Sequence, residues 1–308
     1  LPLIMKRWRL LFFLPVAVLS GCDSREDFAD YDNKEEVTGF RESHNKKVLG
    51  ELEGKKEELA KQLDEPGEED RDKLEEDLAN TNRRLGSPEF FTHDATMEDL
   101  PEDLIWEEGL DQPELGSSRA KKGGTFNTYF SGLSFPPTIR SIGKNANNSF
   151  RSEHWDNVEM ALVSLHPNTM ETIPGLADRW AVGKDGRTVY FRINEKAKWS
   201  DGNPVTVEDF FMTFHVCLSE YITGPWYRQY YGTMFENITR YDDRHLSVRL
   251  ANKKPKPEYY ASLTPYSRVF YREFGPDFEE RYNWKVRPTT GAYQIRKEDV
   301  IKGRSITL

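Results

Sequence analysis

Side chains that could carry out catalysis are present, but they do not combine into a catalytic pattern. His154, His166 and His215 are well separated and lack the HExxH or CxxC spacing of metal sites. The Gly-x-Ser-x-Gly and P-loop patterns are absent from the sequence. Cys217 lies in an apolar run beside Leu218, so we interpret it as a core residue rather than a nucleophile. We therefore expect no catalytic residue, no metal and no cofactor.

Aromatic side chains are better candidates for a binding site. Trp226, Tyr227, Tyr230 and Tyr231 follow a Gly-Pro pair in a segment that we predict to be a loop. Aromatic rings supply rigid, amphipathic surface to a ligand cleft. The same residues could instead pack the interior of a domain, and both interpretations stay open.

A second candidate follows residues 125–130, where apolar side chains alternate with mostly polar ones and predict a strand. The loop after it contains Ser131, Gly132 and Phe135. A loop rich in Gly and Pro at the end of a strand is where open α/β sheets place ligand contacts. A plain connection is the alternative interpretation.

The elements that would position these residues are clearest between residues 175 and 220. Two apolar runs, 180–182 and 189–193, flank Asp185-Gly186, and this pattern predicts a β-hairpin. We expect Val189, Phe191 and Ile193 to share its buried face.

A helix that packs on a sheet is predicted directly afterwards. Thr206 can cap its start. Asp209 lies three residues later, at the position from which a side chain accepts a hydrogen bond from the backbone N–H of the capping residue. Apolar side chains follow at helical spacing. They are Val207, Phe210, Phe211, Phe214 and Leu218.

The N-terminus has the layout of a secretory signal, because a basic segment at residues 5–9 precedes an apolar run at 10–19. The run is shorter than the roughly 20 residues that span a bilayer. It ends in Leu19-Ser20-Gly21-Cys22, which resembles the lipobox of bacterial lipoproteins. The resemblance implies that residues 1–22 are a lipoprotein signal peptide and that Cys22 is lipidated. An ordinary signal with an incidental cysteine is the alternative.

Residues 23–120 are rich in charge and poor in aromatics. We expect a linker at 23–43, a charged helical hairpin or coiled-coil tether at 44–86, and an acidic linker at 87–120. Leucines at helical spacing on both sides of Pro66-Gly67 predict the two helices; they are Leu49, Leu52, Leu59, Leu63, Leu74, Leu78 and Leu85. A spacer or partner-binding hairpin and a solvated, partly disordered spacer both stay open.

The charge balance excludes nucleic acid as a partner. The 308 residues carry a formal net charge of −9. An acidic protein without a basic stripe gains no counterion-release free energy from DNA or RNA. Most Trp, Tyr and Phe lie beyond residue 122, so we expect the core to form there.

Residues 121–308 contain several motifs in a fixed order. They are Lys122-Gly123-Gly124-Thr125-Phe126, Leu176-Ala177-Asp178-Arg179-Trp180, Phe191-Arg192-Ile193, Trp199-Ser200-Asp201-Gly202-Asn203-Pro204-Val205-Thr206 and Glu208-Asp209-Phe210. In this order they resemble the family 5 extracellular solute-binding proteins, which include oligopeptide, dipeptide and nickel receptors. Pro288-Thr289-Thr290-Gly291-Ala292-Tyr293 keeps only part of that family's Pro-x-Gly-Thr-Gly-Pro-Tyr crossover.

The resemblance implies an α/β, periplasmic-binding-protein-like fold of two lobes that closes on its ligand. Residues 121–308 would then be a solute-binding domain that is incomplete at its C-terminus, with the first lobe largely present and the second missing. Thr290 and Gly291 would lie where the connection between the lobes begins. We expect a strand from there through Ile295, and a ligand or hinge role for both residues.

For function, the resemblance implies a substrate-binding lipoprotein of an ABC importer. Its partners would be an oligopeptide or similar small solute, the ABC permease subunits, and a membrane held through the lipid anchor. It would lie in the cell envelope, facing the periplasm or the cell exterior, and would catalyse nothing. The alternative is a structural or sensory envelope lipoprotein whose solute-binding-like domain has no transport role.

Overall fold

The computed structural model describes residues 34–64, 71–86, 92–121, 123–130 and 134–308. The chain divides into two compact units, residues 1–31 and 32–308, and every described residue belongs to the second. Helices and strands are mixed along this unit, so the predicted α/β class is confirmed. The signal segment and Cys22 lie outside the described residues.

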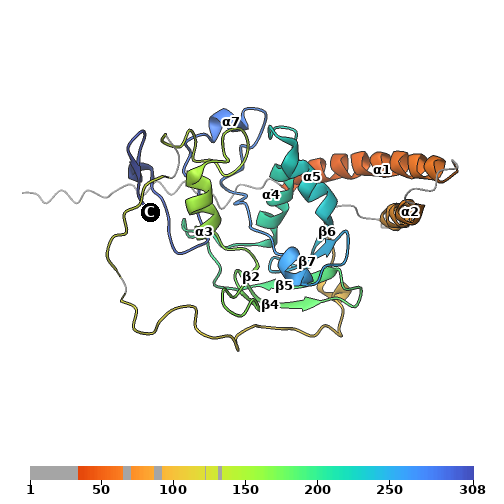
Figure 1. Cartoon of the computed structure of the whole chain (residues 1–308), viewed down its shortest axis with the longest axis horizontal. Helices are drawn as coiled ribbons and strands as arrows, with labels where there is room; N and C mark the ends of the chain where they lie inside the picture. Colours follow the sequence, from red (N-terminus) through yellow and green to blue (C-terminus); the bar gives the residue numbers. More distant parts are fainter. Residues whose placement is uncertain (1–33, 65–70, 87–91, 122, 131–133) are drawn as a thin grey trace, which may run out of the picture. The chain divides into compact units, whose positions relative to one another are not determined.

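One sheet of five strands, in the order β1-β6-β7-β5-β4, carries the fold (Figure 1). Strand β1 pairs with β6 in parallel, and all other neighbours are antiparallel. The strands are β1 (Thr92–Asp94), β4 (Ala177–Val182), β5 (Thr188–Ile193), β6 (Phe235–Arg240) and β7 (His245–Leu250).

Strands β4 and β5 form the predicted β-hairpin. Val182 pairs with Val189 across the turn, and Gly186 in that turn has a φ of 66°, which favours glycine. Phe191 and Ile193 are fully buried together with Val189. The alternation of the sequence therefore places these three side chains in the core, as predicted.

Helix α4 (Val207–Leu218) coincides with the predicted helix, and all of its residues are buried. The Asp209 carboxylate accepts a hydrogen bond from the Thr206 N–H at 3.0 Å, as expected for a capping box. Phe210 and Phe214 join the main core cluster with side chains of the sheet. Helices α4 and α5 (Pro225–Met234) lie on the same side of the sheet (Figure 1).

The remaining elements of the described residues are short. They are η2 (Met97–Asp99), the π-helix η3 (Arg151–Trp155), α3 (Asp156–Val158), β2 (Val163–Leu165), β3 (Thr172–Pro174), α6 (Pro257–Tyr260), α7 (Phe278–Arg281), η4 (Lys297–Asp299), β8 (Val300–Ile301) and β9 (Ser305–Ile306).

Two predicted strands are wrong. Residues 125–130 form no strand, and the side chains of Phe126 and Tyr129 stay 91% and 84% exposed. Residues 290–295 also form none. An alternating pattern shows a preference for extended backbone, but a strand also requires a partner strand to satisfy its N–H and C=O groups. Neither segment has one among the described residues.

Part of the predicted acidic linker, residues 87–120, belongs to the sheet instead. Thr92 in β1 lies opposite Ile238 of β6. Glu107 and Trp180 form an isolated antiparallel bridge at the other edge, on β4. This segment thus supplies one edge strand of the sheet, β1, and contacts the other, β4, which a solvated linker would leave open.

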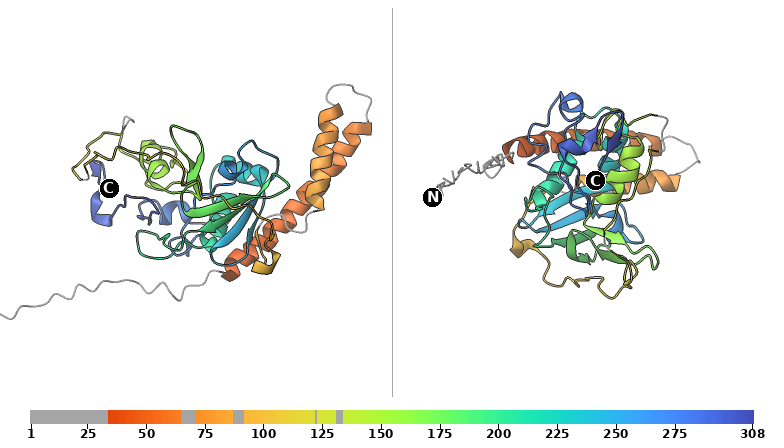
Figure 2. Two further views of the ribbon diagram at one scale, coloured as in Figure 1. Left: turned by 90° about the horizontal axis from the view of Figure 1, so that it is seen from below. Right: turned by 90° about the vertical axis from the view of Figure 1, so that its left-hand side faces the viewer.

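Helices α1 (Lys34–Asp64) and α2 (Arg71–Leu85) lie on either side of residues 65–70 and run side by side (Figure 2). Val48 and Leu52 of α1 form a small apolar cluster with Leu85 of α2. Leu49, which we expected on the buried stripe, is 37% exposed. Val48 takes its place one residue earlier.

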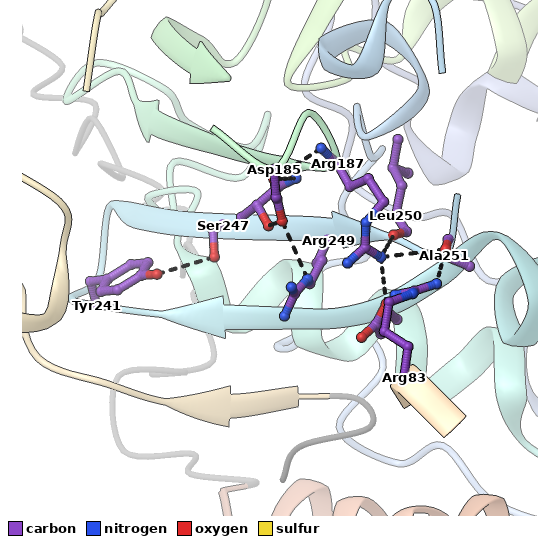
Figure 3. A network of polar contacts seen from close by, with 10 residues as sticks. Arg83, Asp185, Arg187, Tyr241, Ser247, Arg249, Leu250 and Ala251 are labelled. Atoms are coloured by element: carbon purple, nitrogen blue, oxygen red, sulfur yellow. Dashed lines mark hydrogen bonds and ion pairs between the residues drawn. The ribbon is translucent and has the colours of Figure 1, made fainter. Parts of the chain in front are cut away.

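Arg83 attaches α2 to the sheet through charge (Figure 3). Its guanidinium lies 2.5 Å from the buried Glu236 carboxylate on β6 and donates to the carbonyl of Ala251. Arg187 reaches the same Glu236 oxygen at 2.7 Å and also donates to the carbonyl of Leu250. Two arginines therefore share one carboxylate, and the helical hairpin is bound to the sheet at this point.

Candidate functional site

A cavity of about 280 Å³ lies between η3 and α3 on one side and α5 on the other. It combines aromatic rings with three charged side chains. The lining residues are Ser141, Arg151, Trp155, Asp156, Glu159, Trp226, Tyr227, Tyr230, Tyr231, Thr264 and Tyr266.

Helix α5 supplies the aromatic wall. The segment was predicted as a loop, and that prediction is wrong, because Pro225 occupies the first turn of a helix. The helical spacing places Trp226 flat on Tyr230, with ring centroids 5.0 Å apart and planes 6° from parallel. Trp226 stays 58% exposed at the rim, whereas Tyr227 is half-buried. The two predicted candidates therefore line one cavity.

Glu159 lines the cavity opposite α5, and a buried ion pair holds its side chain. The Arg287 guanidinium contacts the Glu159 carboxylate, and the two side chains are 4% and 9% exposed. Burial raises the pKa of Glu159, and the charge of Arg287 partly opposes that rise. Arg287 also lies over the Trp155 ring, 4.4 Å from its centroid. The arginine is thus held by a carboxylate and an aromatic face together.

A second, more exposed set of charges lies between the two walls. Arg151 donates to the Tyr227 hydroxyl and lies 3.4 Å from the Asp156 carboxylate, whose side chain is 53% exposed. Burial of Arg151 favours its neutral form, but the nearby Tyr227 and Asp156 outweigh this, so the pKa of Arg151 is raised. Arg151 therefore links the segment 151–156 to α5.

The other predicted residues lie elsewhere. Phe135 stacks on Trp284 at 6.1 Å and belongs to a separate aromatic group with Phe130. Ser131 and Gly132 lie outside the described residues. A cavity of about 900 Å³ is lined by parts of 123–129, 152–158, Tyr293 and Leu308. Phe135 therefore does not line the cavity beside α5.

Thr290 and Gly291 contact the chain on either side of Glu159. The Met160 N–H donates to the Thr290 hydroxyl at 3.0 Å. A Cβ placed on Gly291 would overlap the carbonyl oxygen of Val158, so the two backbones touch directly. These two residues do not line the smaller cavity, but they fix the segment that carries Glu159.

Cys217 does not line the cavity. Cys217 is 1% exposed within α4, and burial raises the pKa of its thiol to about 12. Among the described residues, no group of three or more His, Cys, Asp or Glu side chains could hold a metal ion. The arrangement suits reversible contact with a small group through rings, carboxylates and hydroxyls.

The C-terminal part of the chain matches a known protein family. Residues 171–308 match the model of the bacterial extracellular solute-binding proteins, family 5 Middle. These residues are therefore similar to the family 5 solute-binding proteins. The match includes α4, α5 and Arg287, so the aromatic wall of the cavity lies within the matched residues.

Curated relatives match over limited lengths. The periplasmic oligopeptide-binding protein OppA of Salmonella typhimurium is 28% identical over 155 residues, which are 44% of this chain and 26% of that protein. The dipeptide-binding protein DppE of Bacillus subtilis is 50% identical over 40 residues, or 13% and 7% of the two chains. The chain thus spans about a quarter or less of these relatives.

Solved structures of similar proteins align at low identity. OppA of Haemophilus influenzae, crystallised with RPPGFSPFR, shares 19% identity over 53% of this chain and 34% of that chain, with a TM-score of 0.42. AppA of Bacillus subtilis, solved with a nonapeptide, shares 16% identity over 56% and 34%, with a TM-score of 0.45.

Sequence reasoning missed Arg151, Glu159 and Arg287. Glu159 and Arg287 are brought together only by tertiary packing, and each looks like an ordinary surface charge when the sequence is considered alone. A signal for α5 was present, since proline directly after glycine is common at the start of a helix. No helix of the described residues is long and apolar enough to cross a membrane.

Proposed function

We propose that this protein is the substrate-binding lipoprotein of an ABC importer and that it captures oligopeptides or similar small solutes outside the cytoplasmic membrane. It delivers the solute to permease subunits and changes no bond. The match of residues 171–308 to the solute-binding family is the observation that carries the proposal. The cavity between α3 and α5 supports it, because an open aromatic wall opposite a buried charge pair fits a recognition site.

The lipid anchor is part of the same proposal. A basic and apolar leader followed by Leu19-Ser20-Gly21-Cys22 supports acylation at Cys22, which would hold the receptor at the membrane. Labelled fatty acid should enter the wild-type protein and not a Cys22→Ser variant. Equal labelling of both would overturn the anchor without touching the binding claim.

Solute binding is tested by calorimetry of the full chain against a peptide library, with tryptophan fluorescence as a second readout. We expect Trp226→Ala to weaken peptide binding by about tenfold or more, since truncation of a tryptophan that anchors a ligand costs about 2 kcal/mol or more of binding free energy. Tyr259→Ala is the matched control, because Tyr259 is an exposed aromatic on α6 and does not line the cavity.

A binding result and the neighbouring genes can each count against this function. Absence of binding to any peptide, combined with tight binding of a sugar or a metal chelate, would defeat the proposed substrate class. Genes for a permease and an ATPase beside this gene would favour import. Without them, the structural or sensory lipoprotein becomes the better account.

A further inference from the structure

A local excess of positive charge lies where α2 meets the sheet, although the whole chain carries a formal net charge of −9. The buried Glu236 carboxylate is shared by Arg83 and Arg187 (Figure 3). Burial lowers the pKa of Arg84, which also feels the charges of Glu236 and Arg83. Among the described residues, one acid therefore faces three arginines at this point.

The chain just after β7 adds two lysines to the same place. Arg83 donates to the carbonyl of Ala251, and Lys253 and Lys254 follow that residue closely. The Lys253 side chain lies beside Gly186, because a Cβ placed on that glycine would be 3.7 Å from the lysine Cε. Lys253 is exposed and Lys254 is half-buried. The two lysines thus extend the basic surface toward solvent.

Other acids nearby offset this charge only in part. Asp185 lies 3.5 Å from Arg249, so this pair adds no net charge. The Glu258 carboxylate on α6 accepts a hydrogen bond from the Thr172 hydroxyl and counts as one negative charge. With Glu236 and Glu258 included, the five basic side chains leave a local charge of +3.

An exposed aromatic ring lies within this basic surface. The Nζ of Lys254 is 5.4 Å from the ring centroid of Tyr260, which is 38% exposed. Tyrosine is enriched where proteins meet membrane headgroups, because its ring is apolar and its hydroxyl stays wet. A lysine stem can likewise cover apolar surface while its ammonium remains in water. Lysine beside an exposed tyrosine therefore fits a lipid surface better than charge alone would.

The fold assembles this surface from segments that are far apart in the sequence. The basic residues come from positions 83–84, 187 and 253–254, so no continuous basic run indicates it. We call its solvent-facing part the junction patch, which consists of Arg83, Arg84, Lys253, Lys254 and Tyr260.

We propose that the junction patch docks the receptor on the anionic headgroups of the membrane that holds its lipid anchor. This inference rests on the proposed function, because acylation at Cys22 is what brings the chain to that membrane. A tether raises the effective concentration of the two surfaces, so a contact too weak to hold a free protein still orients an anchored one. The attraction acts within a Debye length, about 8 Å at physiological salt.

The first test maps the contact by modifying lysines of the full chain with an amine-reactive reagent and reading each site by mass spectrometry. Lys253 should react at least about threefold more slowly on vesicles of equal parts phosphatidylglycerol and phosphatidylcholine than on phosphatidylcholine alone. About 0.5 M salt should remove the difference by screening. Lys55 and Lys56 are exposed on α1 and should react equally on both vesicles.

The second test compares two double variants with the same change of charge. Lys253→Gln with Lys254→Gln alters the patch, and Lys55→Gln with Lys56→Gln is the matched control on α1. The measured quantity is the ratio of partition into anionic vesicles to partition into zwitterionic vesicles, in which the apolar contribution of the N-terminus cancels. Each basic residue at an anionic surface is worth about fivefold, so the patch variant should lower this ratio by about tenfold or more. The control should lower it by less than about twofold.

The outcomes separate this proposal from the proposed function. Equal modification of Lys253 on both vesicles, or the same fall in the partition ratio for both variants, would overturn the docking patch. Loss of binding to a short DNA duplex in the patch variant, with vesicle partition unchanged, would assign the patch to nucleic acid and also overturn it. Peptide binding should be the same in wild type and patch variant, because neither lysine lines the cavity beside α5. Wild-type protein that binds no peptide would defeat solute capture while leaving the vesicle results in force.

Discussion

Helices α4 and α2 both contact the sheet, but different forces hold them. Every residue of α4 is buried, and its aromatic side chains pack into the main apolar core. Helix α2 buries only Thr81 and is bound to β6 through the Arg83–Glu236 contact. Apolar burial is non-directional and distributed over many atoms, whereas the charged contact depends on a few atoms in one geometry. The fold therefore has one region held by apolar packing over many atoms and one whose link to the sheet depends on a charged contact.

The largest effect is expected from truncation in α4. Phe214 is 1% exposed and lies edge-on to both Tyr231 and Phe235, at 5.5 and 5.4 Å. Phe214→Ala should lower the free energy of unfolding by about 3 to 5 kcal/mol, because it removes buried area and leaves a cavity. Urea denaturation followed by circular dichroism measures this loss. A loss below 1 kcal/mol would contradict the assignment of α4 to the cooperative core.

A pH dependence of intermediate size is expected from His215, also in α4. Burial lowers the pKa of His215 to about 4, below the ordinary value of 6.5. The unfolded chain therefore binds the proton more readily, so the contribution of His215 to stability is complete above pH 6.5 and is lost as the pH falls towards 4. Relative to His215→Phe, the wild type should lose on the order of 3 kcal/mol of unfolding free energy over that range.

The free energy of unfolding should be measured for wild type and variant at pH 4.5 and at pH 7. The difference between the two proteins is compared at each pH, because the contributions of other titrating groups cancel in that difference. Asp209 is one such group, since burial raises the pKa of its carboxyl to about 6. A difference that does not change with pH would show that the imidazole is equally easy to protonate in both states.

The smallest effect on global stability is expected at Arg83. Arg83→Met keeps an apolar stem but removes the contact with Glu236, while Arg187 still pairs that carboxylate. The unfolding free energy should fall by only about 1 to 2 kcal/mol, but hydrogen exchange in α2 should accelerate while that in α4 stays slow. Arg71→Met, which breaks an exposed pair with Glu75 in the same helix, is the control. Equal acceleration in α2 and α4 would erase the distinction between the two regions.

The sequence predicted the elements whose signals are local. The β4–β5 hairpin has its Asp185-Gly186 turn and its alternation within a dozen residues, and α4 has both a cap and a continuous apolar stripe. The segment 125–130 has an equally clear alternation, yet within the part of the chain that the structure describes it pairs with no strand. Local pattern describes what a segment prefers, and pairing decides whether that preference is met.

The candidate site was predictable only in part, for the same reason. Trp226 and Tyr227 were found from residue type, although their helix was misread because Trp and Tyr are mediocre helix formers. Glu159, on the opposite side of the cavity, carries no local signal. Its partner Arg287 is far along the chain, and the two meet because residues 287–291 pack against residues 158–160.

The contact between Gly291 and Val158 limits which residues can occupy position 291. Any side chain there would begin with an atom already inside the Val158 carbonyl, so no choice of rotamer relieves the conflict. Even alanine would push the two backbone segments apart. This would move Arg287, four residues earlier, away from Glu159. A library randomised at codon 291 and selected for intact protein should therefore return almost only glycine. Tolerance of other residues at this position would show that the backbones at Val158 and Gly291 are not in contact.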